Sequence, residues 1–325
     1  MPRTNLTLVV SFTTALTVAL SVVAVSGQAR KQPEPSTGTG QKAALRTAWG
    51  DPDLGGIWTN STTTPLERPA ALAGRQTLNE REAAELPQPT ADAPPPAGDP
   101  GTYNEFWWER GRRSTRTSLV VDPPDGRIPP LTPEAERREK QPIYNTGRSG
   151  TDSWLDRSLY ERCITRGMPD SMIPGFYNHN YHIFQTRDYV AILIEMIHDV
   201  RIIPLDGRPH VNSSVGLWLG DARGRWEGDT LVVDTTNFTY KNSYRGSREG
   251  LHLVERFRRV DADTIDYQFT VDDPKTFTRP WTVATPMART PGPVYEYACH
   301  EGNYGMYNLL VAARAEEQAA KERAK

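Results

Sequence analysis

The stretch LHLVERFRRVDADTIDYQFTV, residues 251–271, alternates apolar and polar residues on both sides of the turn Asp261–Ala262–Asp263. The more apolar face holds Leu251, Leu253, Glu255 and Phe257 before the turn, and Ile265, Tyr267, Phe269 and Val271 after it. Successive side chains of a strand point to opposite faces, so this alternation predicts two half-buried strands. The short connection between them predicts an antiparallel hairpin.

The same spacing of strands and turns extends along the middle of the chain. Further strands are expected in YHIFQT (181–186), YVAILIEMIHDVRII (189–203), RGRW (223–226), TLVVDTTNF (230–238) and RPWTVATPM (279–287). We therefore predict a mainly β core over residues 151–310. An antiparallel meander of about eight strands should close into a lipocalin-like barrel or fold into a two-sheet sandwich, because open sheet edges invite aggregation.

The first residues of the chain predict export. Residues 1–29 contain one Arg, then a long uncharged apolar stretch, and then small residues that end at Ala29. This order is typical of a secretory signal peptide, and the alternative is an uncleaved membrane anchor, because the stretch is long enough to span a bilayer. We expect a periplasmic or extracellular protein with no membrane span after cleavage.

Two segments lie between the signal peptide and the core. Residues 30–50 are small and polar and predict a flexible lead-in. Prolines crowd much of residues 51–150, and proline neither donates to a sheet nor fits a helix interior. The stretches YNEFWWERG (103–111) and TSLVV (117–121) are apolar enough to favour an arm packed on the core over a disordered linker. We expect TSLVV to form a strand.

Three shorter elements are expected at the edges of this arrangement. PDLGGIWTN (52–60) predicts a turn that enters a strand. TLNEREAAEL (77–86) predicts a short helix, in which Thr77 and Glu80 have the spacing of a capping box. Residues 311–325 are polar and rich in alanine, and they predict a short C-terminal helix with little to bury.

The chain has two cysteines, Cys163 and Cys299. In an exported protein a single pair of cysteines predicts a disulfide. This bond would close a loop of more than a hundred residues, and loop-closure entropy then stabilises the fold by roughly 4–5 kcal/mol.

Charge and motifs limit the classes of function. The formal net charge is −2, which argues against a nucleic-acid partner, because such proteins usually carry a basic surplus. The sequence contains no GxSxG, HExxH or CxxC motif. No cofactor and no metal-ligand set is predicted, and the expected partner is a small molecule.

The segment 189–203 holds the candidate catalytic residues. Both of its faces are largely apolar, which predicts a central strand, and Glu195, Asp199 and Arg201 would point the same way from it. Buried charges need partners or a wet cavity. The three residues then form either a structural ion-pair network or an acid–base site in which Arg201 holds an anionic oxygen. His210, on the following loop, would approach this site as the partner of Glu195 or Asp199.

Candidate ligand-binding residues lie in two further stretches. In GFYNHNYHIFQ (175–185), Tyr177, Asn178, Tyr181 and His182 suit a polar or ring-shaped ligand, and the alternative is an ordinary turn and strand. In EYACHEGNYG (296–305), His300 and Glu301 follow Cys299. The disulfide would hold them at the entrance of the β core.

Several long motifs resemble those of a family of secreted bacterial proteins found in acidobacteria and some proteobacteria. They are PDLGGIWTN, TSLVVDPPDGRIPPLTPE, DSWLDRSLYERC, EMIHDVRIIPLDGRPH, GRWEGDTLVVDTTNF, FTVDDPKTFTRPW and EYACHEGNYG. The resemblance covers nearly all of the chain after about residue 50. It implies export and a single architecture, and it implies no catalytic residues, since the family has no established activity. GIWTN also resembles the Gly-x-Trp entry strand of lipocalin-like barrels.

Together these features predict an exported protein that binds or acts on a small polar or aromatic molecule in a β-barrel cavity. Acid–base chemistry of the lyase, hydrolase or isomerase type is one hypothesis. The alternative is a periplasmic ligand-binding or envelope-interaction protein without turnover.

Overall fold

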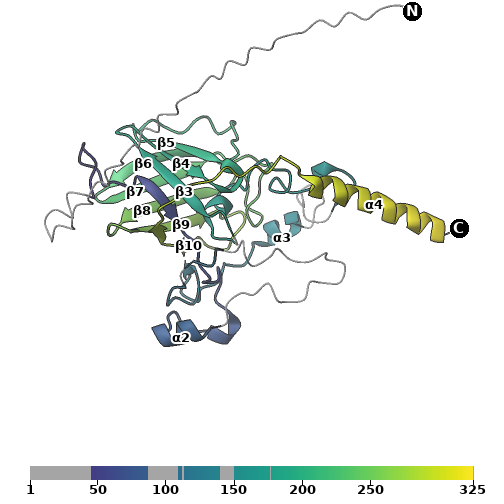
Figure 1. Cartoon of the computed structure of the whole chain (residues 1–325), viewed down its shortest axis with the longest axis horizontal. Helices are drawn as coiled ribbons and strands as arrows, with labels where there is room; N and C mark the ends of the chain where they lie inside the picture. The colour runs from purple at the N-terminus through teal and green to yellow at the C-terminus, as the bar shows by residue number, and fades with distance from the viewer. Residues whose placement is uncertain (1–44, 87–108, 112, 140–149, 176, 325) are drawn as a thin grey trace, which may run out of the picture. The chain divides into compact units, whose positions relative to one another are not determined.

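Antiparallel strands form the core of the described structure (Figure 1). The strands are β1 (Gly56–Thr59), β2 (Val120–Asp122), β3 (Asn180–Gln185), β4 (Tyr189–Ile194), β5 (Val200–Pro204), β6 (Asp221–Glu227), β7 (Thr230–Thr236), β8 (His252–Arg259), β9 (Thr264–Asp272), β10 (Trp281–Ala284) and β11 (Met287–Arg289). The α-helices are α2 (Glu80–Glu85), α3 (Pro133–Glu139) and α4 (Tyr304–Arg323). The 3-10 helices are η1 (Ala70–Leu72), η4 (Trp154–Asp156), η5 (Asp170–Met172) and η6 (Met196–His198).

The computed structural model describes residues 45–86, 109–111, 113–139, 150–175 and 177–324. All of them belong to one compact unit, Gly38–Lys325. The expected signal peptide and most of the expected lead-in lie outside the described residues. Residues 87–108 and 140–149 of the expected arm also lie outside them.

One sheet contains all of the strands. It runs in the order β5-β4-β3-β1-β11-β9-β8-β7-β6, and β10 pairs with both β9 and β2. This sheet curls into a nearly closed antiparallel barrel, so the predicted mainly β fold is confirmed and the sandwich alternative is not adopted. β1 and β2 come from the proline-rich arm, which therefore supplies strands to the sheet as well as covering it.

The two ends of the nearly closed barrel, β5 and β6, lie next to each other without a hydrogen-bonded ladder between them. The path has nine strands and eight neighbouring pairs, each antiparallel, so β5 and β6 run in the same direction. Parallel neighbours need a long crossover connection. Residues 205–220 make that connection. At the seam a Cβ atom on Gly224 would lie 2.8 Å from Ile203 Cγ2 and 2.5 Å from Leu205 Cδ2, so glycine permits the close approach.

The hairpin expected in residues 251–271 is present as β8 and β9. Phe257 pairs with Tyr267, and Glu255 pairs with Phe269. All four side chains are buried on the inner face of the barrel. The alternation in the sequence therefore identified the inner face correctly, including the charged residue on it.

The expectation of one strand over residues 189–203 is wrong. β4 ends at Ile194 and the chain reverses through η6, where Ile197 and His198 have φ values of 62° and 46°. β5 then pairs antiparallel with β4 and ends the sheet path, with Ile202 64 % exposed. Because the chain turns, counting alternate residues from β4 does not tell which face of the sheet Arg201 lies on.

Both expected helices differ in their bounds. α2 is capped by Asn79 with Glu82, two residues later than the expected pair. Thr77 instead lies in an extended bridge with Arg116, which keeps it out of the helix. α4 begins at Tyr304, earlier than expected, because the Asn303 side chain caps its first turn.

Cys163 and Cys299 form the predicted disulfide, which is therefore confirmed. The bond joins the segment before β3 to the segment that leads into α4. No helix in the part of the chain that the structure describes has the length and apolar character needed to cross a bilayer.

Candidate functional site

Large side chains fill the interior of the barrel, where the sequence suggests a ligand cavity. The inner residues with at most 1 % exposed surface include Trp58, Tyr181, Phe257, Tyr267, Phe269 and Trp281. Arg201 also lies inside, and its guanidinium makes two hydrogen bonds to Glu255, the first at 2.9 Å. Burial alone would lower the pKa of Arg201, but the Glu255 carboxylate raises it. Tyr267 donates a further hydrogen bond of 2.8 Å to Glu255.

The expected grouping of Arg201 with Glu195 and Asp199 is therefore wrong. Glu195 accepts hydrogen bonds from Asn180 at 2.6 Å and from the Tyr295 backbone at 3.0 Å. Those contacts hold the β4–β5 turn against the segment that carries the disulfide.

Asp199 follows η6 and makes its contact with a different segment. It accepts a hydrogen bond of 2.7 Å from Thr165, two residues after Cys163. Burial raises the pKa of Asp199, and the hydrogen bonds from Thr165 and the Arg166 backbone offset this in part. Glu195 and Asp199 thus connect loops, and the geometry does not bring them to His210.

His210 instead belongs to a chain of charged groups on the outer face of β6, β7 and β8. This His–Asp chain consists, in order of contact, of Arg223, Asp221, His210, Asp234 and His252. His210 Nδ1 lies 3.0 Å from Asp221 Oδ2, and its Nε2 lies 3.1 Å from Asp234 Oδ1. Asp234 Oδ2 lies 2.9 Å from His252 Nε2. A histidine does meet two carboxylates, but they are not the two expected from the sequence.

Each carboxylate of the His–Asp chain lies between two partners. Asp234 lies between His210 and His252, and Asp221 lies between His210 and Arg223. Burial by itself would raise the pKa of Asp221, but hydrogen bonds from the Val211 backbone, His210 and Arg223 lower it overall.

The expected ligand-binding residues do not gather in one place. Tyr181 is fully buried, and its hydroxyl lies 3.2 Å from Asn60 Oδ1. The Asn178 backbone donates to Glu109. His182 lies on the opposite face of β3 from Tyr181, with its ring 3.9 Å from that of Phe184. His300 and Glu301 are exposed. Of these residues, only Tyr177 lines a cavity, which lies beside the disulfide.

His179 and His182 are three positions apart in the sequence, and their side chains do not belong to a common metal site among the described residues. His179 is 1 % exposed, and burial, followed by the Arg166 charge, lowers its pKa to about 3. It is therefore neutral at ordinary pH. No three His, Cys, Asp or Glu side chains within the described ranges are grouped so that they could hold a metal ion.

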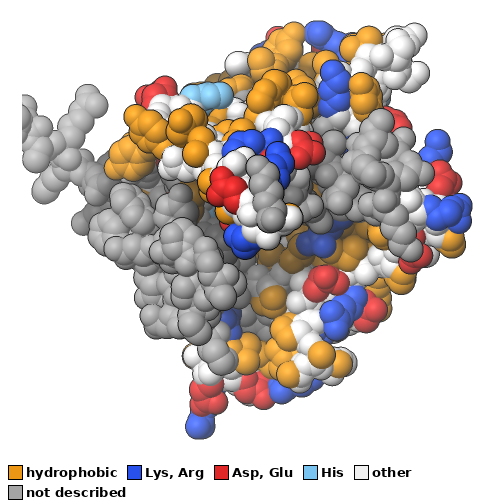
Figure 2. Space-filling model, turned by 90° about the vertical axis from the view of Figure 1, so that its right-hand side faces the viewer, with side chains coloured by type: hydrophobic (Ala, Val, Ile, Leu, Met, Phe, Trp, Pro, Cys, Tyr) orange, Lys and Arg blue, Asp and Glu red, His pale blue; other side chains and the backbone are white. Residues whose placement is uncertain are grey.

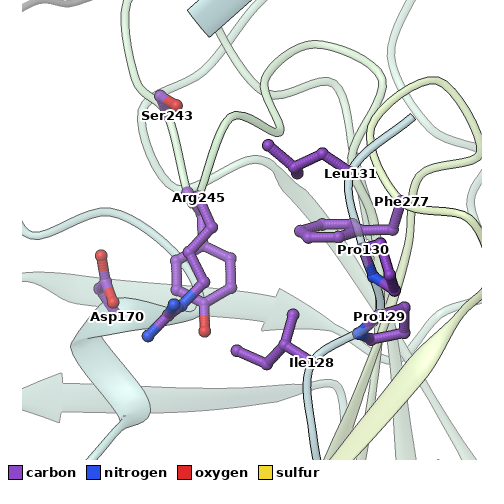
Figure 3. Close-up of a pocket in the computed structure, with 9 residues that line it drawn as sticks. Ile128, Pro129, Pro130, Leu131, Asp170, Ser243, Arg245 and Phe277 are labelled. Carbon is purple, nitrogen blue, oxygen red and sulfur yellow. The ribbon is translucent and has the colours of Figure 1, made fainter. Parts of the chain in front are cut away.

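A cavity of about 500 Å³ lies at one end of the barrel, and we call it the mouth cavity (Figure 3). Its volume falls in the range of small-molecule sites. Near the start of β8, Leu253 pairs with Thr235 at the end of β7 and His252 pairs with Asp272 at the end of β9, so the loops that follow β7 and β9 meet at this end. The cavity is lined by Ile128, Pro129, Pro130, Leu131, Asp170, Ser243, Tyr244, Arg245 and Phe277.

One wall of the mouth cavity is apolar and rigid. Backbone hydrogen bonds of 2.9 Å from Thr132 to Thr276 and 3.0 Å from Thr278 to Pro130 tie the arm to the loop after β9. In Figure 3, Pro129, Pro130 and Leu131 stand beside Phe277. This wall offers flat apolar surface to the ring of a ligand.

The other wall is polar and comes from a tight turn. Tyr244 and Ser247 exchange backbone hydrogen bonds of 2.9 Å, and Arg245 and Gly246 between them have φ values of 50° and 88°. Two central residues with positive φ are the pattern of a type I′ turn. Arg138 donates to the Gly246 carbonyl at 3.0 Å and supports the turn from α3. Arg245 is exposed and extends toward the side on which Asp170 lies (Figure 3).

Tyr244 joins these walls to the core. Its ring is 4 % exposed and stacks on Trp281 at a centroid distance of 6.0 Å. Its hydroxyl is buried and makes no hydrogen bond of good geometry within the described residues, although the Arg245 side chain lies near it. Burial raises the pKa of Tyr244, Asp170 raises it further, and Arg245 opposes both effects. A buried polar group without a partner costs about 1–3 kcal/mol, so this hydroxyl requires an explanation.

The sequence reasoning did not identify the mouth cavity. One available signal was the length of the connection between β7 and β8, residues 237–251, because long ordered loops between strands often carry function. The pair Arg245–Gly246 within it is also a turn signal. The His–Asp chain carried no comparable signal, because its members are far apart in the sequence.

Charges of both signs mix on one face of the described structure (Figure 2). Figure 2 shows the face on the side where α4 lies in Figure 1, and acidic and basic side chains are interspersed across its described part. Comparisons of the chain with protein-family models, curated proteins and solved structures find no match.

Proposed function

We propose that this protein binds a small, hydroxylated, ring-containing molecule in the mouth cavity. The single observation that carries the proposal is the buried hydroxyl of Tyr244, a residue that lines the cavity. No hydrogen bond of good geometry within the described residues satisfies this hydroxyl, and Arg245 lies near it. A ligand atom that hydrogen-bonds to it would remove the cost of this group.

The chemistry of the walls defines the ligand class. Arg245 donates hydrogen bonds and Asp170 accepts them, and both line the same cavity. A hydroxyl group satisfies both kinds of partner, because it donates and accepts. The apolar wall of Pro129, Pro130 and Phe277 suits the flat side of a sugar, a cyclic polyol or a phenol.

The proposal places the protein outside the cytoplasm. The N-terminal apolar stretch and the disulfide support export, since such bonds persist mainly in oxidising compartments. Membership of the secreted bacterial family that the motifs resemble is part of the same proposal.

The first test is a thermal-shift screen of the mature protein with monosaccharides, cyclic polyols and phenols, followed by calorimetry with the best compound. Arg245→Asn should weaken binding by about 10–100-fold, because a hydrogen bond from a charged donor is lost. Asn–Gly is the preferred type I′ pair, so the turn should remain folded. Tyr244→Phe should weaken binding by roughly 3–10-fold and raise the melting temperature of the free protein by about 2–4 °C.

Arg279→Asn is the matched control, since Arg279 is half-exposed in an ion pair with Asp122 and does not line the cavity. It should leave binding unchanged. The proposal fails if no compound stabilises the wild type, or if Arg245→Asn and Arg279→Asn behave alike.

A second candidate function is acid–base turnover of a compound of the same class by the His–Asp chain, whose members do not line the mouth cavity, as a lyase, hydrolase or isomerase. The observation that favours it is the His252–Asp234 pair, in which His252 is 39 % exposed and begins β8 directly after the loop that carries Tyr244 and Arg245. A carboxylate that orients a partly exposed histidine is the usual arrangement of a general base.

This function is tested by incubating the protein with the compound selected in the screen and searching for product by mass spectrometry. Asp234→Asn should lower turnover by about 10²–10⁴-fold, because His252 loses its orienting carboxylate. Asp229→Asn is the control, since Asp229 is 66 % exposed and pairs with Arg46 away from the His–Asp chain. Absence of product with the wild type would leave binding without turnover as the function.

A further inference from the structure

A second cavity of about 520 Å³ lies beside the disulfide, separate in its lining residues from the mouth cavity. We call it the tyrosine cavity. It is formed by the segments 157–163, 297–299 and 303–309 together with Tyr177. Because the disulfide joins the first of these segments to the second, the walls are held together covalently.

Tyr160, Tyr177 and Tyr297 line this cavity from three different segments. Burial raises the pKa of Tyr297, and the neighbouring hydroxyls of Tyr160 and Tyr177 raise it further. Their hydroxyls therefore lie close to one another. Tyrosine offers a flat apolar ring and a polar tip, which is the combination that aromatic ligands use.

Arg157 supplies the polar end of the cavity. Its Nη1 donates 3.2 Å to the Gly150 carbonyl, and its Nη2 pairs with Glu161. Its Nε–H is buried and has no acceptor among the described residues. An unpaired N–H on a charged group favours an incoming acceptor oxygen.

The remaining wall is apolar. Met306 and Leu309 face the cavity from the first turns of α4. A methionine thioether packs well against the edge of an aromatic ring. Between them, the lining residues offer aromatic rings, a soft apolar surface and hydrogen-bond donors.

We infer that the tyrosine cavity binds a flat aromatic molecule that carries an acceptor oxygen, such as an aromatic carboxylate. The ring lies between the tyrosines and Met306, and the oxygen accepts from Arg157 Nε and a tyrosine hydroxyl. This site is independent of the one proposed for the mouth cavity.

The test uses the mature, disulfide-bonded protein and 4-hydroxybenzoate as the probe, with binding measured by calorimetry and by saturation-transfer NMR. Tyr297→Phe should weaken binding by about 3–10-fold. Tyr295→Phe is the matched control, since that ring is 69 % exposed and does not line the cavity, and it should leave binding unchanged. Met306→Trp should fill the cavity and abolish binding without lowering the melting temperature.

Arg245→Asn separates the two sites, because it alters only the mouth cavity. Binding of 4-hydroxybenzoate that survives Arg245→Asn and is lost in Met306→Trp supports the inference. Binding that survives Met306→Trp, that is lost in Arg245→Asn, or that is absent from the wild type overturns it.

Discussion

Glu255→Ala should destabilise the protein by about 3–5 kcal/mol, which is among the largest effects expected of any single substitution in the chain. Glu255 is 0 % exposed and is the partner of Arg201, of which 3 % is exposed. Removing the carboxylate leaves a guanidinium buried without its counter-charge and leaves the Tyr267 hydroxyl without its acceptor. Urea denaturation followed by tryptophan fluorescence measures the loss.

A double variant separates the cost of breaking the pair from the value of having it. Arg201→Met combined with Glu255→Leu should recover most of the lost stability, because apolar residues of similar size often replace a buried pair without penalty. Glu227→Ala is the control, since Glu227 pairs with Arg225 and Arg256 on the surface, and it should cost less than about 1 kcal/mol. A loss below that of the control in Glu255→Ala would show that water reaches the pair.

Replacing both Cys163 and Cys299 with serine should lower the free energy of unfolding by about 2–5 kcal/mol. The two cysteines are 136 positions apart, so the disulfide removes much of the freedom of the unfolded chain. The measurement is denaturation of the variant and of the wild type in the same buffer without reductant.

Intact mass after alkylation supplies the companion measurement. The native exported protein should take up no alkylating group, and two modified thiols would contradict the disulfide. Adding reductant should lower the stability of the wild type toward that of the double serine variant and leave the variant itself unchanged. If reductant affects both proteins equally, the stabilisation does not come from this bond.

The sequence predicted the strands that alternate cleanly and are joined by short turns. In residues 251–271 each side chain is assigned to a face by period two alone, and the structure places Leu253, Phe257, Tyr267 and Phe269 inside as expected. The same logic failed over residues 189–203. A run of residues that is apolar on both faces does not indicate where the chain reverses. The reversal at η6 depends on positive φ values at Ile197 and His198.

The partners of the candidate site residues could not be predicted from the sequence for a similar reason. Arg201 was selected because a charged group in apolar surroundings needs a partner, and His210 because its loop was expected to approach Arg201; both have acidic partners. Their partners, Glu255 and Asp234, lie on strands that follow much later in the chain. No spacing rule within a segment connects such residues, because their contact depends on sheet order and on the crossover between β5 and β6.

The sequence by itself thus determined the local properties of this protein: an apolar N-terminal stretch, a single pair of cysteines, and strands whose faces follow from alternation. Those properties depend on residues a few positions apart or on composition. Only the tertiary structure decided that β5 and β6 lie side by side in the same direction at the edge of the nearly closed barrel, that Arg201 pairs with Glu255, and that Tyr244 lines a cavity. These features depend on which distant segments the folded sheet brings into contact, and side-chain period carries no information about that choice.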